Sequence, residues 1–109
     1  MHIQLAEILE SLNIDVAFME YEGNNSEYII FSIYDEREED FTDDKNDSEV
    51  FYIDIKYWFK DKTKINNYKK IKSLLKSEGF IFDGAKDLKT NNYYGKSLDF
   101  IYEKNTEEE

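Results

Sequence analysis

Few side chains in this sequence have a type and spacing that could carry chemistry, and the first candidate is a phosphate-binding loop. Gly95, Lys96 and Ser97 match the last positions of such a loop, whose backbone N–H groups and lysine hold phosphate. The motif also requires another glycine five positions before Gly95, but this chain has Thr90 there. The segment has the composition of a strand interior, so we expect no nucleotide site there.

Metal-binding patterns are also incomplete. Asp43, Asp47 and Glu49 have the spacing of calcium ligands, but the glycine and the final glutamate of a calcium loop are replaced by Ser48 and Asp54. We therefore favour a solvated acidic loop over a calcium-binding loop. The chain has no cysteine, which excludes a disulfide, a thiol nucleophile and a cysteine-based zinc site.

Acid–base and nucleophilic residues lack recognisable partners. The single histidine, His2, belongs to no nucleophile motif, and we expect an exposed terminal side chain. Two of the 25 acidic residues could meet in a cleft as acid and base, but in so acidic a chain such proximity arises by chance. The sequence thus predicts no enzyme, no catalytic residue, no cofactor and no metal.

Composition narrows the class of partner. The net charge of −11 disfavours ordinary binding to nucleic acid or to an anionic membrane surface. No apolar run approaches the roughly 20 residues that span a bilayer, and the N-terminus lacks the pattern of a signal peptide. Tyrosine and phenylalanine are abundant, with nine and eight copies, and tyrosine suits half-wet surfaces and subunit interfaces.

Hydrophobic periodicity predicts the elements that must position any functional side chain. Helices are expected over 2–13 and over 63–78, the second capped by Asp61 or Thr63 and ended by Gly79. Runs of β-branched and aromatic residues predict strands over residues 14–21, 28–34, 50–60, 80–82 and 93–103. The order α-β-β-β-α-β-β favours an α+β fold, a mainly antiparallel sheet of four to five strands with two helices on one face. We expect the first two strands to form a hairpin and the last strand to lie at an exposed edge.

The strand over 50–60 has one apolar and one mixed face. Phe51, Ile53, Ile55, Tyr57 and Phe59 alternate and are expected in the core, as are the helix residues Ile65, Tyr68, Ile71, Leu74 and Leu75. The mixed face, Val50, Tyr52, Asp54, Lys56 and Trp58, should meet water or a partner. Trp58 could stack on a base or a sugar, although the net charge opposes a nucleic-acid strand.

Charge divides the chain into regions of opposite sign. We expect one domain over 1–102, with a solvated acidic loop over 35–49, and a frayed acidic tail over 103–109. The loop holds nine acids and two bases, whereas residues 56–76 hold eight lysines and only one acid, Asp61. These regions could be two solvated faces. Alternatively, the basic face of one subunit could dock on the acidic face of the next and close a ring.

Four stretches resemble one protein family. They are YIIFSIYDE at 28–36, EVFYIDIKYWF at 49–59, LLKSEGF at 74–80 and, most specifically, YYGKSLDFIY at 93–102. The chain resembles the tail-terminator, or tail-to-head joining (tail completion), proteins of long-tailed bacteriophages. The resemblance implies an α+β subunit of a hexameric ring that caps the tail tube at its head-proximal end. Its partners would be the tail tube protein and the head-tail connector, and the protein, made in the host cytoplasm, would reside in the virion.

This hypothesis assigns two sets of residues to assembly. The ring or partner interface would comprise Lys69, Lys72, Lys76, Trp58, Tyr93 and Tyr94. The acidic loop would face the lumen or a neighbouring ring, where carboxylates repel the passing genome, through Glu38, Glu39, Asp40, Asp43, Asp44 and Asp47. An alternative is an acidic DNA mimic or inhibitor that sequesters a basic enzyme site, although the lysine-rich second helix argues against it.

Overall fold

The computed structural model describes residues 1–40 and 47–105 of the 109-residue chain. Two helices and five strands occur in the predicted order, which confirms the α+β class. In chain order the elements are α1 (His2–Glu10), β1 (Asp15–Phe18), β2 (Glu27–Asp40), β3 (Asp47–Phe59), the 3-10 helix η1 (Lys62–Asn67), α2 (Tyr68–Ser77), β4 (Ile81–Lys89) and β5 (Tyr94–Asn105).

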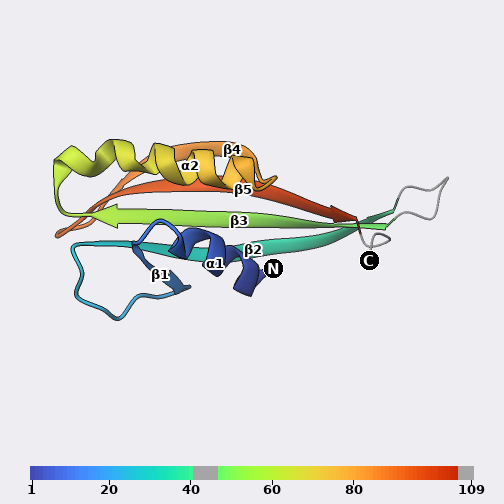
Figure 1. The fold of residues 1–109 in the computed structure, drawn as a ribbon, viewed down its shortest axis with the longest axis horizontal. Coiled ribbons are helices and arrows are strands. Elements are labelled where there is room, and N and C mark those ends of the chain that lie inside the picture. The colour runs from blue at the N-terminus through green and yellow to red at the C-terminus, as the bar shows by residue number, and fades with distance from the viewer. Residues whose placement is uncertain (41–46, 106–109) are drawn as a thin grey trace.

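The five strands form one sheet in the order β1-β2-β3-β5-β4, and all neighbours except β1 and β2 are antiparallel (Figure 1). The prediction that the first two strands form a hairpin is wrong, because they run parallel to each other. Residues 19–26 return the chain to the start of β1, where β2 begins with Tyr28 paired to Asp15. The expected edge position of the last strand is also wrong. β5 pairs with β3 over twelve positions and with β4 on its other side, so β4 forms the edge.

The boundaries of the second helix follow from its capping residues. The Asp61 side chain accepts hydrogen bonds from the Thr63 N–H at 3.0 Å and the Thr63 hydroxyl at 2.7 Å, so the chain enters η1 before α2. The predicted single helix is thus a 3-10 segment followed by an α-helix. Gly79 follows the helix with φ of 94°, a left-handed conformation that glycine adopts without a Cβ clash, as predicted.

The core lies between the sheet and the two helices, which cover the same face (Figure 1). The predicted core face of β3 is confirmed, since all five of its apolar side chains are at most 6% exposed. Ile71 and Leu75 of α2 and Leu5 and Leu9 of α1 are fully buried against them. The predicted helix residues Ile65, Tyr68 and Leu74 are only half-buried. In the described part of the chain no helix covers the opposite face, which we call the open face.

The acidic segment differs most from its prediction. Residues 35–40 continue β2 and residues 47–49 begin β3, so the expected loop is wrong over these positions, and residues 41–46 lie outside the described chain. Asp35 pairs with Tyr52 and Arg37 with Val50 after a register shift that follows Ile33. The backbone is held as a strand because β3 here pairs on both sides, with β2 and with β5. For the same reason, residues 103–105 of the expected tail belong to β5.

Candidate interaction surface

The predicted interface residue Trp58 lies half-buried on the open face of the sheet. Its cross-strand neighbours are Tyr28 on β2 and Gly95 on β5. A Cβ atom on Gly95 would lie 2.6 Å from the Trp58 ring, so glycine is what lets the indole approach the β5 backbone. The Gly95-Lys96-Ser97 segment is therefore a strand interior, as expected, and its glycine seats an aromatic ring.

Three tyrosines continue this aromatic surface. Tyr21 stacks on Tyr28 with ring centroids 3.9 Å apart, and Tyr93 meets Tyr28 edge-on at 5.3 Å. The Tyr93 hydroxyl donates to the Asn25 carbonyl at 3.0 Å, and the Lys60 ammonium lies 5.0 Å from the Tyr93 ring centroid. These contacts hold residues 19–26 against the sheet. We call Tyr21, Tyr28, Trp58 and Tyr93 the aromatic cluster.

Tyr94, although adjacent to Tyr93, lies on the helix side of the sheet. Its ring stacks on Phe59 with centroids 6.0 Å apart, and the ammonium groups of Lys62 and Lys89 lie 5.4 and 4.7 Å from its centroid. Phe59, Lys62, Ile65 and Tyr94 line an open hollow of about 260 Å³. Neighbouring strand residues point to opposite faces, so the two tyrosines that the sequence grouped belong to different surfaces.

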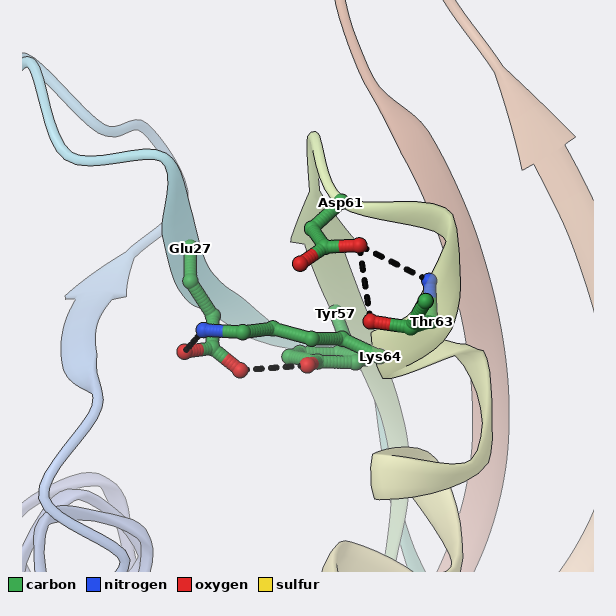
Figure 2. Close-up of polar contacts among 5 residues, drawn as sticks. All are labelled: Glu27, Tyr57, Asp61, Thr63 and Lys64. Atoms are coloured by element: carbon green, nitrogen blue, oxygen red, sulfur yellow. Dashed lines mark hydrogen bonds and ion pairs between the residues drawn. The ribbon is translucent and has the colours of Figure 1, made fainter.

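Beside this hollow a half-buried polar cluster ties β2, β3 and η1 together (Figure 2). The buried Tyr57 hydroxyl donates to Glu27 Oε2, and Lys64 Nζ lies 3.2 Å from Glu27 Oε1. Burial alone would raise the pKa of Glu27, but the Tyr57 hydrogen bond and Lys64 outweigh it and hold the pKa below its usual value. Burial and the Glu27 carboxylate raise the pKa of Tyr57, so at neutral pH the cluster is an ionised acid held by a phenol and an ammonium.

The predicted helix lysines lie apart from the aromatic cluster. Lys69 and Lys76 are exposed on α2. Lys72 is half-buried because its ammonium lies 4.2 Å from the centroid of the Phe82 ring on β4. Lys72 therefore differs from the other two predicted lysines, because its stem covers apolar surface.

Carboxylates occupy the middle of the open face. Asp54 of β3 lies opposite Asp99 of β5, accepts a 2.9 Å hydrogen bond from Ser97 and pairs with Lys56. Burial, followed by the nearby Asp54, raises the pKa of Asp99. The mixed face expected of β3 is confirmed for its half-buried residues Tyr52, Asp54, Lys56 and Trp58, but it is wrong for Val50, which is buried. Two like charges directly opposite each other reduce the stability of the isolated sheet.

The predicted acidic residues gather at one end of the molecule. Glu38 is exposed and its backbone lies opposite Glu49, Glu39 lies opposite Ser48, and Asp40 lies opposite Asp47. Asp43 and Asp44 lie outside the described residues. This end projects beyond both helices, and the molecule measures 52 × 23 × 22 Å (Figure 1).

Lysines gather at the opposite end, where β3 leads into η1. Lys60 and Lys62 come from the lysine-rich stretch that the sequence identified, but Lys89 comes from β4. No sequence signal indicated Lys89, because only the β4–β5 pairing brings it to the Tyr94 ring. The interface residues predicted from the sequence therefore lie on different surfaces of the molecule. A cluster of three lysines, Lys60, Lys62 and Lys89, lies at one end.

The remaining candidates for chemistry are His2 and possible metal ligands, and neither forms a site in the described residues. His2 is exposed and packs edge-on against Phe18, with ring centroids 4.9 Å apart. Among the described residues no three acidic or histidine side chains gather as metal ligands, and neither helix is long and apolar enough to cross a membrane.

Comparison of the sequence with models of known protein families and with curated proteins finds no match.

Proposed function

We propose that this chain is a structural subunit of a phage tail, a tail terminator that assembles as a hexameric ring. The ring caps the tail tube at its head-proximal end and joins it to the head connector. The sequence resemblance, strongest in YYGKSLDFIY, supplies the family. The observation that carries the proposal is an elongated subunit with an acidic end, a lysine-rich end and an uncovered sheet face.

The open face supports contact with a large protein partner. Its aromatic cluster combines apolar area with hydroxyl groups, and Tyr34 and Ile81 add apolar surface that is 56% and 55% exposed. Such a surface suits a broad, partly wet interface, and we assign it to the tail tube.

Deletion of the protein from a phage that encodes it tests the proposal. We expect tails of irregular length, or tails that are not attached to heads, when lysates are examined by electron microscopy. Supplying the protein in trans should restore joined particles of uniform length. Normal, joined particles in its absence would show that the chain is not a terminator.

The acidic DNA mimic is the alternative, and the like-charged pairs of the β2–β3 hairpin favour it, because paired rows of carboxylates can imitate phosphates. Glu38 and Glu49, whose backbones lie opposite each other, are such a pair. The mass of the protein in solution separates the two functions. A monomer that binds one basic enzyme supports mimicry. A six-fold ring, or a monomer that forms a ring only on a tail tube, supports the terminator.

A further inference from the structure

The two edges of the sheet carry opposite charge. The strand order places β1 at one edge and β4 at the other, with α1 beside β1 and α2 beside β4 (Figure 1). Residues 1–26, which form α1, β1 and the return to β2, contain five acidic residues and no lysine or arginine. Residues 60–89, which run through η1, α2 and β4, contain nine lysines and four acidic residues.

At the β4 edge, lysines of α2 and β4 lie next to each other. Lys69, Lys72 and Lys76 recur at helical spacing and so share one side of α2. That side faces β4, because the Lys72 ammonium lies 4.2 Å from the centroid of the Phe82 ring. Lys86 is exposed on β4 itself. Within residues 1–40 and 47–105 none of these four lysines makes an ion pair. We define the β4 side as the four lysines together with the exposed residues Ile81 and Ala85.

At the β1 edge, exposed apolar residues accompany the acids. Ile3, Phe18 and Met19 are 78%, 48% and 66% exposed. The His2 ring lies 4.9 Å from the Phe18 ring, which brings the start of α1 beside the end of β1. Exposed apolar residues that gather in this way mark a surface for protein contact. We define the β1 side as these three apolar residues together with three exposed acids that make no ion pair in the described chain, Glu7, Glu10 and Glu20.

One subunit cannot bring its own two sides together. Four strand spacings separate β1 from β4, roughly 19 Å in all, and the two sides face away from each other. A second copy supplies what each side lacks, because its carboxylates would meet the lysines and its apolar residues would meet Ile81 and Ala85. Opposite charges across a contact also steer docking and fix its register.

We infer that the β4 side of one subunit binds the β1 side of a second copy of this chain, so that copies join edge to edge. The inference rests on the proposed function, because it names the two surfaces by which neighbouring subunits of the ring contact each other. The contact is heterologous, and repeated contacts of this kind generate a ring when the rotation between copies closes. Both surfaces lie at edges of the sheet, which leaves the open face available for the tail tube.

Self-association of the full-length protein tests the contact. Sedimentation equilibrium at low salt should show a mass that rises beyond the dimer with concentration, and added salt should weaken the association. The triple variant Lys69→Glu/Lys76→Glu/Lys86→Glu should weaken it roughly tenfold or more at low salt, because like charges then face each other. The triple variant Glu7→Lys/Glu10→Lys/Glu20→Lys should have the same effect for the same reason.

Mixing the two charge-reversed proteins gives the sharpest result. The first protein has acids at both edges and the second has lysines at both edges, so each repels its own kind. An equimolar mixture should associate at low salt about as strongly as the wild type and contain both proteins in equal number, because every contact between unlike proteins joins opposite charges.

The apolar part of the contact has its own test. The double variant Ile3→Gln/Met19→Asn should weaken association at every salt concentration, because it removes apolar area and no charge. Asparagine tolerates the positive φ of 68° at position 19. A photoreactive phenylalanine analogue at position 3 should crosslink to residues 69–76 or 81–86 of another copy, as isotope-labelled and unlabelled copies would reveal.

The matched control is Lys60→Glu/Lys70→Glu/Lys104→Glu, which makes the same charge change at exposed positions outside both sides. Lys70 lies on the part of α2 that lines a hollow with Leu12 and Asn13, away from β4. The control should leave association nearly unchanged, and circular dichroism should confirm that every variant is folded.

Four results would overturn the inference: a wild type that stays monomeric up to millimolar concentration, a control that weakens association as much as the edge variants, a mixture that does not associate, or crosslinks that map elsewhere. Each of these leaves the terminator function standing, because a ring can use other surfaces or form only on the tail tube. Normal particles without the protein would remove that function whatever the self-association.

Discussion

Removing the Tyr57 hydroxyl isolates the contribution of the half-buried polar cluster of Glu27, Tyr57 and Lys64. In Tyr57→Phe the ring remains, and so does its stacking on Phe59, whose centroid lies 5.0 Å away. Glu27, with a side chain 20% exposed, loses one hydrogen-bond donor and keeps Lys64. The substitution therefore changes one charge-assisted hydrogen bond and little of the packing.

The size of the effect follows from the charge on the acceptor. Hydrogen bonds to ionised groups contribute about 1.5–3 kcal/mol, and a largely buried carboxylate that loses its donor is near the middle of that range. We expect the free energy of unfolding to fall by about 2 kcal/mol at neutral pH. With an m-value of about 1.5 kcal/mol/M in urea, the unfolding midpoint should drop by about 1.3 M.

The loss should depend on pH with a defined sign. The folded-state pKa of Glu27 lies below its ordinary value of 4.5, so its contribution is present above that pH and is lost as the pH falls through the folded pKa. The difference between Tyr57→Phe and wild type should therefore shrink from about pH 7 to about pH 3. Asp99, whose pKa burial raises, shifts stability in the opposite direction but equally in both proteins.

Tyr68→Phe is the matched control. Tyr68 is half-buried, its ring lies 4.5 Å from the Lys96 ammonium, and within the described residues its hydroxyl makes no hydrogen bond. Urea titrations of the three proteins at both pH values provide the measurement. A loss in Tyr57→Phe no larger than in Tyr68→Phe, or one that does not change with pH, would refute the role assigned to Glu27.

Two further predictions concern the core and the open face. Ile53→Asp should abolish folding, because an unpaired buried charge costs several kcal/mol in a domain stabilised by about 5–15 kcal/mol. Asp43→Asn should leave the melting temperature nearly unchanged, and similar behaviour of the two variants would contradict the assignment of Ile53 to the core. Gly95→Ala should lower stability by about 1–3 kcal/mol and shift the emission of Trp58, the single tryptophan, to longer wavelength. Trp58→Leu in the same protein should recover most of the stability, and unchanged emission in Gly95→Ala would refute the close approach.

The fold class and the core were predictable because periodicity reports burial directly. The alternation of Phe51 to Phe59 placed each side chain on the correct face, and the spacing of Ile71 and Leu75 identified the buried side of α2. Gly79 marked the helix end through its backbone conformation. These signals are local, so a single sequence carries them.

Pairing partners were not predictable in the same way. The acidic residues 35–40 have poor strand propensity, yet they form β2 because the backbone of β3 supplies their hydrogen bonds. The parallel pairing of β1 with β2 depends on residues 19–26, where Tyr21 and Asn25 both donate to the Asp15 carboxylate. The cluster of Lys62 and Lys89 likewise depends on which strands are neighbours. Long-range pairing therefore decided the candidate surface, and local pattern could not reveal it.

The acidic end of the sheet, formed by residues 36–40 of β2 and 47–49 of β3, contributes little to the folded core. The large apolar side chains that are fully buried belong to β2, β3, β5 and the two helices, and all of them lie outside this acidic end. Acids opposite each other, such as Glu38 and Glu49, reduce the stability of the isolated strands there. A basic surface on a bound partner would relieve that repulsion without repacking the core. Substitution of Glu38 by Gln should therefore leave the unfolding midpoint nearly constant, while Ile53→Asp should abolish folding.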